Sequence, residues 1–424
     1  MHFYAGLLVG PFLAVAAVTG LLYALIPQVD RMVYRHELTV DHVGEHRLPL
    51  SAQLAAARAA HPEGDLQSIN PPAAANATTR VVLRVADVPA DYSRTVFVDP
   101  YSGQVRGALT TSGEWLPLRA WFDELHRNLH LGAVGRNYSE LAASWLWVLA
   151  LSGSAMWVVQ RRRRGVAALL TPGRSAGRRG RALSWHGSVG VWILVGLLGL
   201  SATGLTWSRY AGEHVQKVRE ELSWVAPSVG TPTSARPAAA ARTPIGPAAD
   251  RALAAADRAG LRGPLWLYPG GRDGGAWQVT ERKRDCPTRG DSIAVDPVTG
   301  AQVQRIDFAQ WPFMAKLTRW AIDAHMGILF GVANQVALVL LALGLLSVIV
   351  RGYQMWWRRA PKRTGLVGRG ALLGLEPAEA VAFVAAVALV GWFVPLLGLS
   401  IGAFVILDGA LGWRRGGQRE GAAG

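Results

Sequence analysis

Hydrophobic residues in this chain gather in long blocks and do not alternate with polar residues at the period of a surface helix or strand. Roughly 20 apolar residues cross a ~30 Å hydrocarbon core as a helix. The blocks are about this long or longer, and they cover residues 3–26, 141–159, 189–207, 328–350 and 378–413. A soluble protein would space its apolar positions for amphipathic elements instead. The pattern therefore predicts an α-helical integral membrane protein in a lipid bilayer.

Basic residues next to the blocks predict the orientation of each span. The four arginines 161–164 follow the second block, and further basic residues precede the third block and follow the fourth and the last. These are Arg174, Arg178, Arg179, Arg181, Arg351, Arg358, Arg359, Lys362, Arg363, Arg414, Arg415 and Arg419. Because positive residues beside spans mark the cytoplasmic side, we expect cytoplasmic termini in a multi-pass protein of the plasma or inner membrane. The net charge of +15 is then explained by basic residues at the cytoplasmic ends of the spans, and we expect no nucleic-acid partner.

These positions divide the chain into ten expected segments. They are a first span (1–26), a first outer domain (27–125), a second span (126–160), a basic cytoplasmic loop (161–183), a third span (184–208), a second outer domain (209–315), a fourth span (316–357), a cytoplasmic loop (358–377), a hairpin of two short spans (378–413) and a cytoplasmic tail (414–424). The last block would be about 54 Å long as one helix. We favour a hairpin that turns near residues 395–400, and one long tilted span is the alternative.

The two outer segments have a similar order of elements. Each begins with a helix-like stretch, at residues 50–60 and 248–260, followed by strand-like runs at 80–85 and 95–98 in the first segment and 265–268, 277–281 and 292–295 in the second. Each ends on a turn of the form Asp-Pro-x-x-Gly. We therefore expect two α+β domains outside the cytoplasm.

An internal repeat is the most informative feature. His2 lies seventeen residues before Thr19-Gly20, and His186 lies seventeen residues before Thr203-Gly204. The outer segments end on Val98-Asp99-Pro100 and Val295-Asp296-Pro297, and Pro117 and Pro312 each lie thirteen residues before His130 and His325. One unit of helix, outer domain and helix therefore occurs twice. Parallel repeats of this kind pack about an axis along the membrane normal and place sites at their interface.

Four histidines hold equivalent places in the repeat and suggest a cofactor. If the halves pack with twofold symmetry, His2 faces His186 at the cytoplasmic side and His130 faces His325 at the outer side. Neutral imidazole is a good ligand for haem iron, so each pair could hold one b-type haem. The plainer interpretation is that a histidine at a span end is an interfacial polar residue.

His126 complicates the outer pair. It lies four residues before His130, which predicts the same helix face, and its counterpart in the second copy is Ala321. It could replace His130 as a ligand or lie near a substrate site. Inside the fourth span, Asn334 and Gln335 could hydrogen-bond to another helix or contact a cofactor or substrate.

These motifs, taken in their order along the chain, resemble those of PepSY-associated transmembrane proteins over about residues 1–360. The matching runs are His2-Phe-Tyr-Ala-Gly with Thr19-Gly20, Leu129-His130-Leu-Gly with Trp145, Trp185-His186-Gly with Thr203-Gly204, and Asp323-Ala-His325-Met-Gly with Asn334-Gln335 and Met355-Trp356-Trp357. The Asp-Pro-x-(Ser/Thr)-Gly turns resemble the ends of PepSY domains. The resemblance implies four core spans as two repeats, two PepSY-like outer domains and an added C-terminal hairpin.

The resemblance also implies an activity. Some members of this family are ferric-siderophore reductases with two b-type haems, so His2, His130, His186 and His325 would be the iron ligands, and a ferric siderophore or another outer acceptor would receive electrons. Two rivals remain: a non-enzymatic PepSY regulator of proteases outside the cytoplasm and, less favoured, a transporter for iron or haem.

Several features limit what the sequence can assign. No GxGxxG with a following acidic residue occurs in a strand–helix unit, so the electron donor would be a quinone or a partner flavoprotein. The one cysteine, Cys286, gives no disulfide or zinc pattern. No signal peptide is evident, and because so little chain precedes His2 we expect the true start to lie upstream of Met1.

Overall fold

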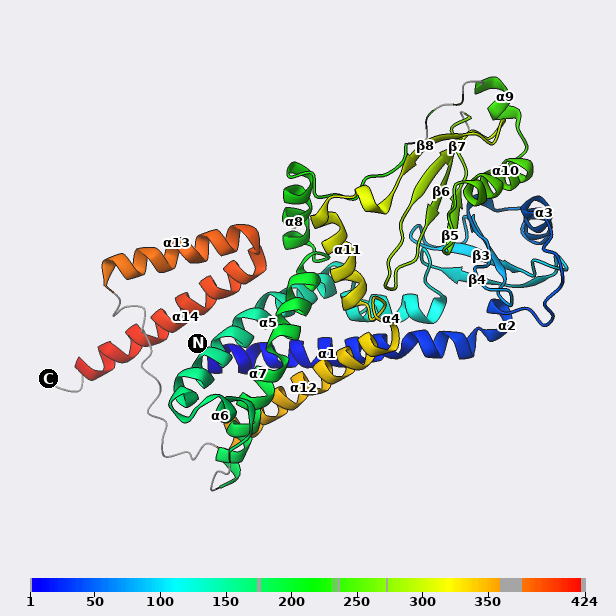
Figure 1. Ribbon diagram of the computed structural model, residues 1–424. Coiled ribbons are helices and arrows are strands. Elements are labelled where there is room, and N and C mark those ends of the chain that lie inside the picture. Colours follow the sequence, from blue (N-terminus) through cyan, green and yellow to red (C-terminus); the bar gives the residue numbers. More distant parts are fainter. Residues whose placement is uncertain are drawn as a thin grey trace. The chain divides into compact units, whose positions relative to one another are not determined.

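The computed structural model describes residues 2–173, 177–230, 232, 234, 237–271, 274–358 and 376–420 (Figure 1). The chain forms two compact units. The first comprises residues 1–21, 124–222 and 336–424, and the second comprises residues 22–123 and 223–335. Most of the loop predicted at 358–377 and the end of the tail predicted at 414–424 lie outside the described residues.

Among the residues that the structure describes, four helices are long and apolar enough to cross a membrane. They are α1 (His2–Val33), α5 (Gly132–Arg161), α7 (Arg178–Leu205) and α12 (Gly331–Trp357). Their order along the chain follows the first four hydrophobic blocks. The protein is therefore a membrane protein with four candidate spans, as the hydrophobic pattern predicts.

The first helix is longer than the span predicted at residues 1–26. Helix α1 continues through Pro27 to Val33, because a proline is tolerated in such helices where neighbouring groups compensate for the lost backbone hydrogen bond. Buried polar side chains lie near this end of the helix. Tyr23 is buried and accepts a hydrogen bond at its hydroxyl from Arg119 Nε at 3.2 Å, and Asp30 is buried too.

The second and fourth predicted spans each consist of two helices separated by a turn. Helix α4 (Pro117–Asn128) precedes α5, and α11 (Phe313–His325) precedes α12. In the first turn Leu129, His130 and Gly132 all have φ of +55°, in the left-handed region that ends a helix. The continuous spans expected at 126–160 and 316–357 are therefore wrong in this detail.

The last hydrophobic block forms a helical hairpin. Helix α13 (Pro377–Phe393) and helix α14 (Pro395–Glu420) meet at Val394, where Pro395 cannot continue the first helix. Gly391 and Gly398 let the two backbones approach closely beside this turn. The division into two helices is as expected, and the crossing of a membrane by this hairpin stays a prediction.

All the named strands belong to one antiparallel sheet. Its strands are β1 (Asp65–Asn70), β2 (Thr79–Arg84), β3 (Ser93–Val98), β4 (Val105–Thr111), β5 (Leu265–Tyr268), β6 (Trp277–Glu281), β7 (Ser292–Val295) and β8 (Gln302–Ile306). The spatial order is β4-β3-β2-β1-β5-β6-β7-β8. Each half thus contributes four strands in mirror order about the β1–β5 pair, as a repeat with twofold symmetry requires.

The two outer segments therefore do not form two separate domains, as expected from sequence, but one. Strand β1 pairs with β5 at Ile69 and Leu267, and Asn70 Nδ2 donates to the carbonyl oxygen of Leu265 at 2.6 Å. A free β1 or β5 would be an exposed edge that invites pairing with another chain. Joining the halves removes both edges at once.

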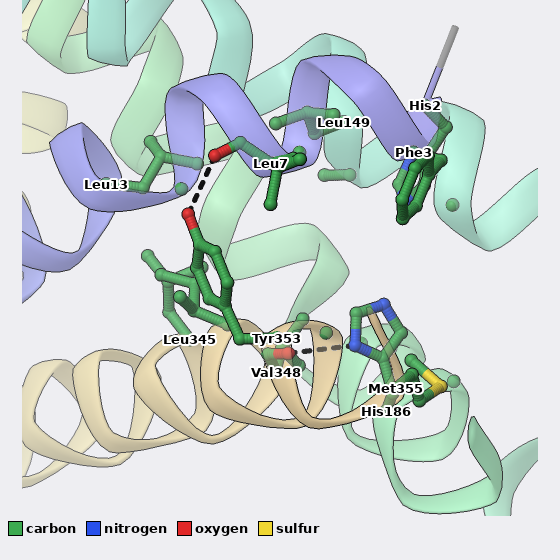
Figure 2. A pocket seen from close by; sticks show the side chains of 18 of the residues that line it. His2, Phe3, Leu7, Leu13, Leu149, His186, Leu345, Val348, Tyr353 and Met355 are labelled. Carbon is green, nitrogen blue, oxygen red and sulfur yellow. Dashed lines mark hydrogen bonds between the residues drawn. The ribbon is translucent and has the colours of Figure 1, made fainter. Parts of the chain in front are cut away.

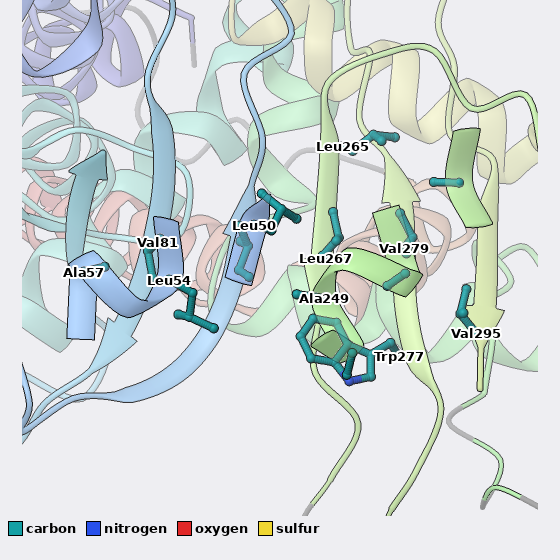
Figure 3. Close-up of a cluster of buried hydrophobic side chains, with 14 of the residues drawn as sticks. Leu50, Leu54, Ala57, Val81, Ala249, Leu265, Leu267, Trp277, Val279 and Val295 are labelled. Atoms are coloured by element: carbon teal, nitrogen blue, oxygen red, sulfur yellow. The ribbon is translucent and has the colours of Figure 1, made fainter. Parts of the chain in front are cut away.

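One hydrophobic core serves both halves of the sheet (Figure 3). Helix α3 (Leu50–Ala60) contributes Leu50 and Leu54, and helix α10 (Ile245–Arg258) contributes a stripe of buried alanines. The stripe comprises Ala248, Ala249, Ala252, Ala255 and Ala256. Its spacing follows one helical face, and its small side chains let α10 lie against α3, where Ser51 N donates to Asp250 Oδ1 at 3.2 Å.

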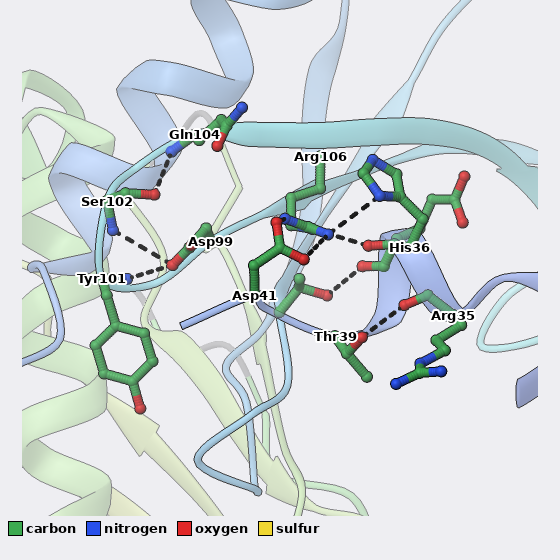
Figure 4. A network of polar contacts seen from close by, with 11 residues as sticks. Arg35, His36, Thr39, Asp41, Asp99, Tyr101, Ser102, Gln104 and Arg106 are labelled. Atoms are coloured by element: carbon green, nitrogen blue, oxygen red, sulfur yellow. Dashed lines mark hydrogen bonds and ion pairs between the residues drawn. The ribbon is translucent and has the colours of Figure 1, made fainter. Parts of the chain in front are cut away.

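The Asp-Pro-x-x-Gly turns have the same geometry in both copies. Asp99 Oδ1 accepts from the backbone N–H groups of Tyr101 and Ser102 (Figure 4), and Asp296 Oδ1 accepts from those of Val298 and Thr299. Gly103 and Gly300 close the turns with φ of +75° and +68°. Burial would raise the pKa of Asp296, but hydrogen bonds from Ser234, Thr299 and Val298 outweigh it and hold that pKa below its usual value.

The outer edge of β4 is covered by helix α2 (Arg35–Leu38) and the loop that follows it. Arg106 on β4 donates from Nε to the carbonyl oxygen of His36 at 2.8 Å and from both terminal nitrogens to Asp41 (Figure 4). This contact also lowers the pKa of Asp41. The remaining short elements are η1 (Arg162–Arg164), α6 (Val166–Leu170), α8 (Tyr210–Glu221), α9 (Pro237–Arg242) and η2 (Phe308–Gln310).

Helix α8 belongs to the first unit, and not to the second outer domain predicted at 209–315. Its position is fixed by Glu140 on α5, a carboxylate that is only 1 % exposed. The two oxygens of Glu140 accept from the backbone N–H groups of Tyr210 and Ala211 at 2.9 and 3.1 Å. A carboxylate at a helix N-terminus satisfies donors that have no partner within the helix, which accounts for a buried acid in this apolar setting.

Candidate functional site

A cavity of about 300 Å³ lies among the spans of the first unit (Figure 2). Its walls come from α1, α5, α7 and α12. Apolar side chains such as Leu7, Leu149 and Leu345 form most of the lining, and His2 and His186 bring imidazole rings to it. Cofactor sites are mostly apolar concavities of roughly 300–1,000 Å³ with a few polar groups. The cavity fits that description.

The tautomer of His186 follows from its hydrogen bond. His186 Nδ1 lies 2.8 Å from the carbonyl oxygen of Val348 on α12 (Figure 2). A carbonyl oxygen can only accept, so Nδ1 carries the hydrogen and the neutral ring has its lone pair on Nε2. Histidines that bind metals commonly donate from their other nitrogen in this way, which fixes the orientation of the ring.

His2 has the same arrangement through a hydroxyl group. His2 Nδ1 lies 2.9 Å from Ser152 Oγ on α5, and the Ser152 hydroxyl donates to the carbonyl oxygen of Val148 at 2.6 Å. Because the hydroxyl hydrogen is directed to Val148, Ser152 Oγ accepts from His2 Nδ1. His2 therefore also has its lone pair on Nε2.

Glycines make room beside these rings. A Cβ on Gly153 would come within 2.8 Å of the His2 ring, and one on Gly352 would lie 3.8 Å from the His186 ring. Gly6 and Gly190 also line the cavity, and a Cβ on either would meet nothing within 4 Å. The helices thus expose bare backbone at the site, which leaves space for a flat molecule.

These residues fit a b-type haem at this position. The cavity would supply two imidazoles to the haem iron, His2 from α1 and His186 from α7, each with its lone pair on Nε2. The apolar lining suits a macrocycle. Among the described residues no group of three or more His, Cys, Asp or Glu side chains could hold a bare metal ion. The donor set therefore fits a metal that brings its own equatorial ligands.

His126 lies beside the Thr19-Gly20 motif of α1. Thr19 Oγ1 donates to the carbonyl oxygen of Val15 at 2.8 Å and lies 2.8 Å from His126 Nδ1, so His126 Nδ1 is the donor of that contact. A Cβ on Gly20 would lie 3.2 Å from the His126 ring. The threonine thus bonds to its own helix, and the glycine makes room for an imidazole.

His130 lies in the exposed turn between α4 and α5. Its backbone N–H donates to Asn128 Oδ1 at 2.9 Å. Since the helix ends before it, His130 does not continue the face on which His126 lies, and the expectation of a shared face is wrong. Its role as an iron ligand stays a prediction.

His325 is the last residue of α11, in the second unit. Asn334 Nδ2 donates to the carbonyl oxygen of Ala324 at 2.8 Å, and Gln335 Oε1 accepts from Gln28. The helix-to-helix hydrogen bonds that the sequence allows for Asn334 and Gln335 are thus present.

A charged network lies close to His325 in the chain. Asp323 is completely buried and accepts from Arg284 Nε at 2.7 Å and from Arg319 Nε at 2.9 Å. Arg284 also pairs with Glu114, and its guanidinium lies 5.0 Å from the ring centre of Trp115. This network fixes the end of α11 to the loop that follows β6.

Sequence reasoning missed the groups that orient the inner histidines. Ser152 and the carbonyl oxygen of Val348 have no motif around them, because each acts through a contact between helices far apart in the chain. The small residues at 6, 10, 187 and 190 were the available signal, since their three- and four-residue spacing places them on one face of each helix.

Comparison with known proteins identifies one relationship. The model of the family described as "PepSY-associated TM region" matches residues 1–359. No curated protein matches this chain. The matched region includes all four candidate spans, the whole sheet and both cavity histidines.

Proposed function

Because the chain belongs to the PepSY-associated TM family, and because one cavity brings His2 and His186 together, we propose that it is a transmembrane di-haem b-type reductase. It would pass electrons across the membrane to an acceptor outside the cytoplasm, a ferric siderophore in iron acquisition. The observation that carries the proposal is the pair of imidazoles with Nε2 lone pairs at one apolar cavity.

The two histidines, their hydrogen-bond partners and the apolar lining have separate parts in this proposal. His2 and His186 would hold the iron through Nε2, while Ser152 and the Val348 carbonyl oxygen orient the rings. The aliphatic lining would exclude water and favour a macrocycle of low charge. A haem bound here supplies a one-electron couple between Fe(III) and Fe(II).

A second haem is supported by the repeat. By the repeat, His130 and His325, or His126 in place of His130, would be its ligands. Electrons would enter from a quinol or a reduced flavoprotein. Each electron would reduce one Fe(III) to Fe(II) in the acceptor, and Fe(II) binds less tightly to hard oxygen ligands.

An anaerobic reoxidation experiment tests this function. The purified full chain in lipid nanodiscs is reduced with dithionite and mixed with a ferric trihydroxamate or a ferric tricatecholate, with a ferrous chelator to trap the product. We expect the reduced haem bands to return to their oxidised form and one Fe(II) to be trapped per electron lost.

Two results would count against the proposal in different ways. Haem bands that stay reduced with both chelates, but reoxidise with ferricyanide, would exclude siderophore reduction while leaving electron transfer in place. Full biological function after replacement of His2 and His186 would favour the non-enzymatic PepSY regulator.

A further inference from the structure

The lining of the cavity contains one charged side chain in addition to the two neutral imidazoles. All other lining residues are apolar, glycine, or neutral and polar, and the exception is Arg179 on α7. A carboxylate enters apolar surroundings only when a cation or hydrogen-bond donors accompany it. In this otherwise neutral cavity, Arg179 is the cation that could accompany one.

The position of Arg179 relative to His186 is set by the helix. The two residues are seven apart on α7, which is two turns and about 10.5 Å along the axis on the same face. Leu183 lies between them and also lines the cavity. Ile193 and Leu197 line it on the other side of His186, so the wall formed by α7 is charged at one end and aliphatic at the other.

The charge of Arg179 is not neutralised by an ion pair with any acidic side chain that the structure describes. Its side chain is exposed at the start of α7 as well as lining the cavity. A guanidinium in this state can bind a carboxylate through two parallel hydrogen bonds.

We propose that Arg179 binds a carboxylate of the macrocycle held by His2 and His186, and so sets which way the macrocycle lies. The inference rests on the proposed function. The carboxylate edge points toward the start of α7, and the apolar edge points toward Ile193 and Leu197.

The same charge acts on the redox equilibrium. The oxidised iron centre carries one more positive charge than the reduced centre, so a nearby guanidinium disfavours oxidation. Arg179 would thus raise the reduction potential of the haem at this site.

The test compares Arg179→Gln with Arg181→Gln in the full chain. Arg181 lies two residues further along the same helix, is exposed and does not line the cavity. Potentials are measured by spectroelectrochemical titration, and haem retention by transfer to apomyoglobin. We expect Arg179→Gln to lower the potential of one haem and speed its loss, Arg179→Lys to restore much of the potential, and Arg181→Gln to resemble the wild type.

A second measurement keeps the inference testable if Arg179→Gln folds poorly. The apoprotein and the Arg179→Lys variant are reconstituted with haem b or with its dimethyl ester, which has no free carboxylate. We expect the wild type to retain haem b better than the ester. Equal retention, or equal potentials in Arg179→Gln and Arg181→Gln, would overturn the role of Arg179 while the protein still binds haem. Absence of haem from the wild type would instead refute the proposed function.

Discussion

Replacing His186 by alanine is expected to remove about half of the haem from each chain, because one of two sites loses an axial ligand. The rest of the cavity should be unchanged, since the side chain of His186 joins the helices through one hydrogen bond, from Nδ1 to the Val348 carbonyl oxygen. His2→Ala should have the same effect, because both rings serve one site. Pyridine haemochrome content per chain is the measurement.

A control and a rescue separate ligation from folding. His61→Ala removes a partly buried imidazole that lies outside the cavity and whose Nδ1 contacts Glu63, and it should leave the haem content unchanged. Imidazole added to His186→Ala should restore the low-spin spectrum, because the small molecule can occupy the space that the side chain leaves. Full haem content in both His2→Ala and His186→Ala would refute ligation by this pair.

Replacing Asp323 by alanine is expected to destabilise the sheet unit by about 3–5 kcal/mol. The reason is that Arg284 and Arg319 both lose the completely buried carboxylate that accepts their hydrogen bonds. At about 1.4 kcal/mol per factor of ten, amide hydrogens of β5–β7 that exchange by opening of the whole unit should exchange roughly two to three and a half orders of magnitude faster. Hydrogen exchange read by mass spectrometry on the full chain in nanodiscs measures this.

The matched control is Asp87→Ala. Asp87 pairs with Arg94 at 2.7 Å, but its side chain is 60 % exposed, and exposed pairs contribute roughly 0–1 kcal/mol. Similar exchange rates in the two variants would show that the Asp323 network does not stabilise the unit. The effect of Asp323→Ala should extend to β1–β3, because both halves share one sheet and one core.

The spans and the elements of the outer segments could be predicted because their signals are local. Leu50–Ala60, Leu265–Tyr268, Trp277–Glu281 and Ser292–Val295 form at the predicted residues, since apolar periodicity and turn residues delimit them. Strands β1, β4 and β8 were missed. They are rich in Asp, Gln, Ser, Gly and Arg, and they form through pairing with better strands.

The joining of the two outer segments could not be predicted, because it depends on contacts between residues almost 200 positions apart. Ile69 and Leu267 carry no mark of their partner, and the alanines of α10 read only as helix formers. The inner histidine pair was predictable from the repeat. The outer set was less so, since the left-handed turn at Leu129 and His130 separates residues that sequence spacing places on one helix.

The most direct test of the account is the absorption spectrum of the purified full chain, expressed with ample haem, before and after dithionite. Two imidazoles at one cavity predict a Soret band in the oxidised protein and sharp α and β bands on reduction, as bis-histidine b-type haem gives. Loss of part of this spectrum in His2→Ala and His186→Ala would assign it to the cavity. A chain that shows neither a Soret band nor a reduced α band would contradict the account.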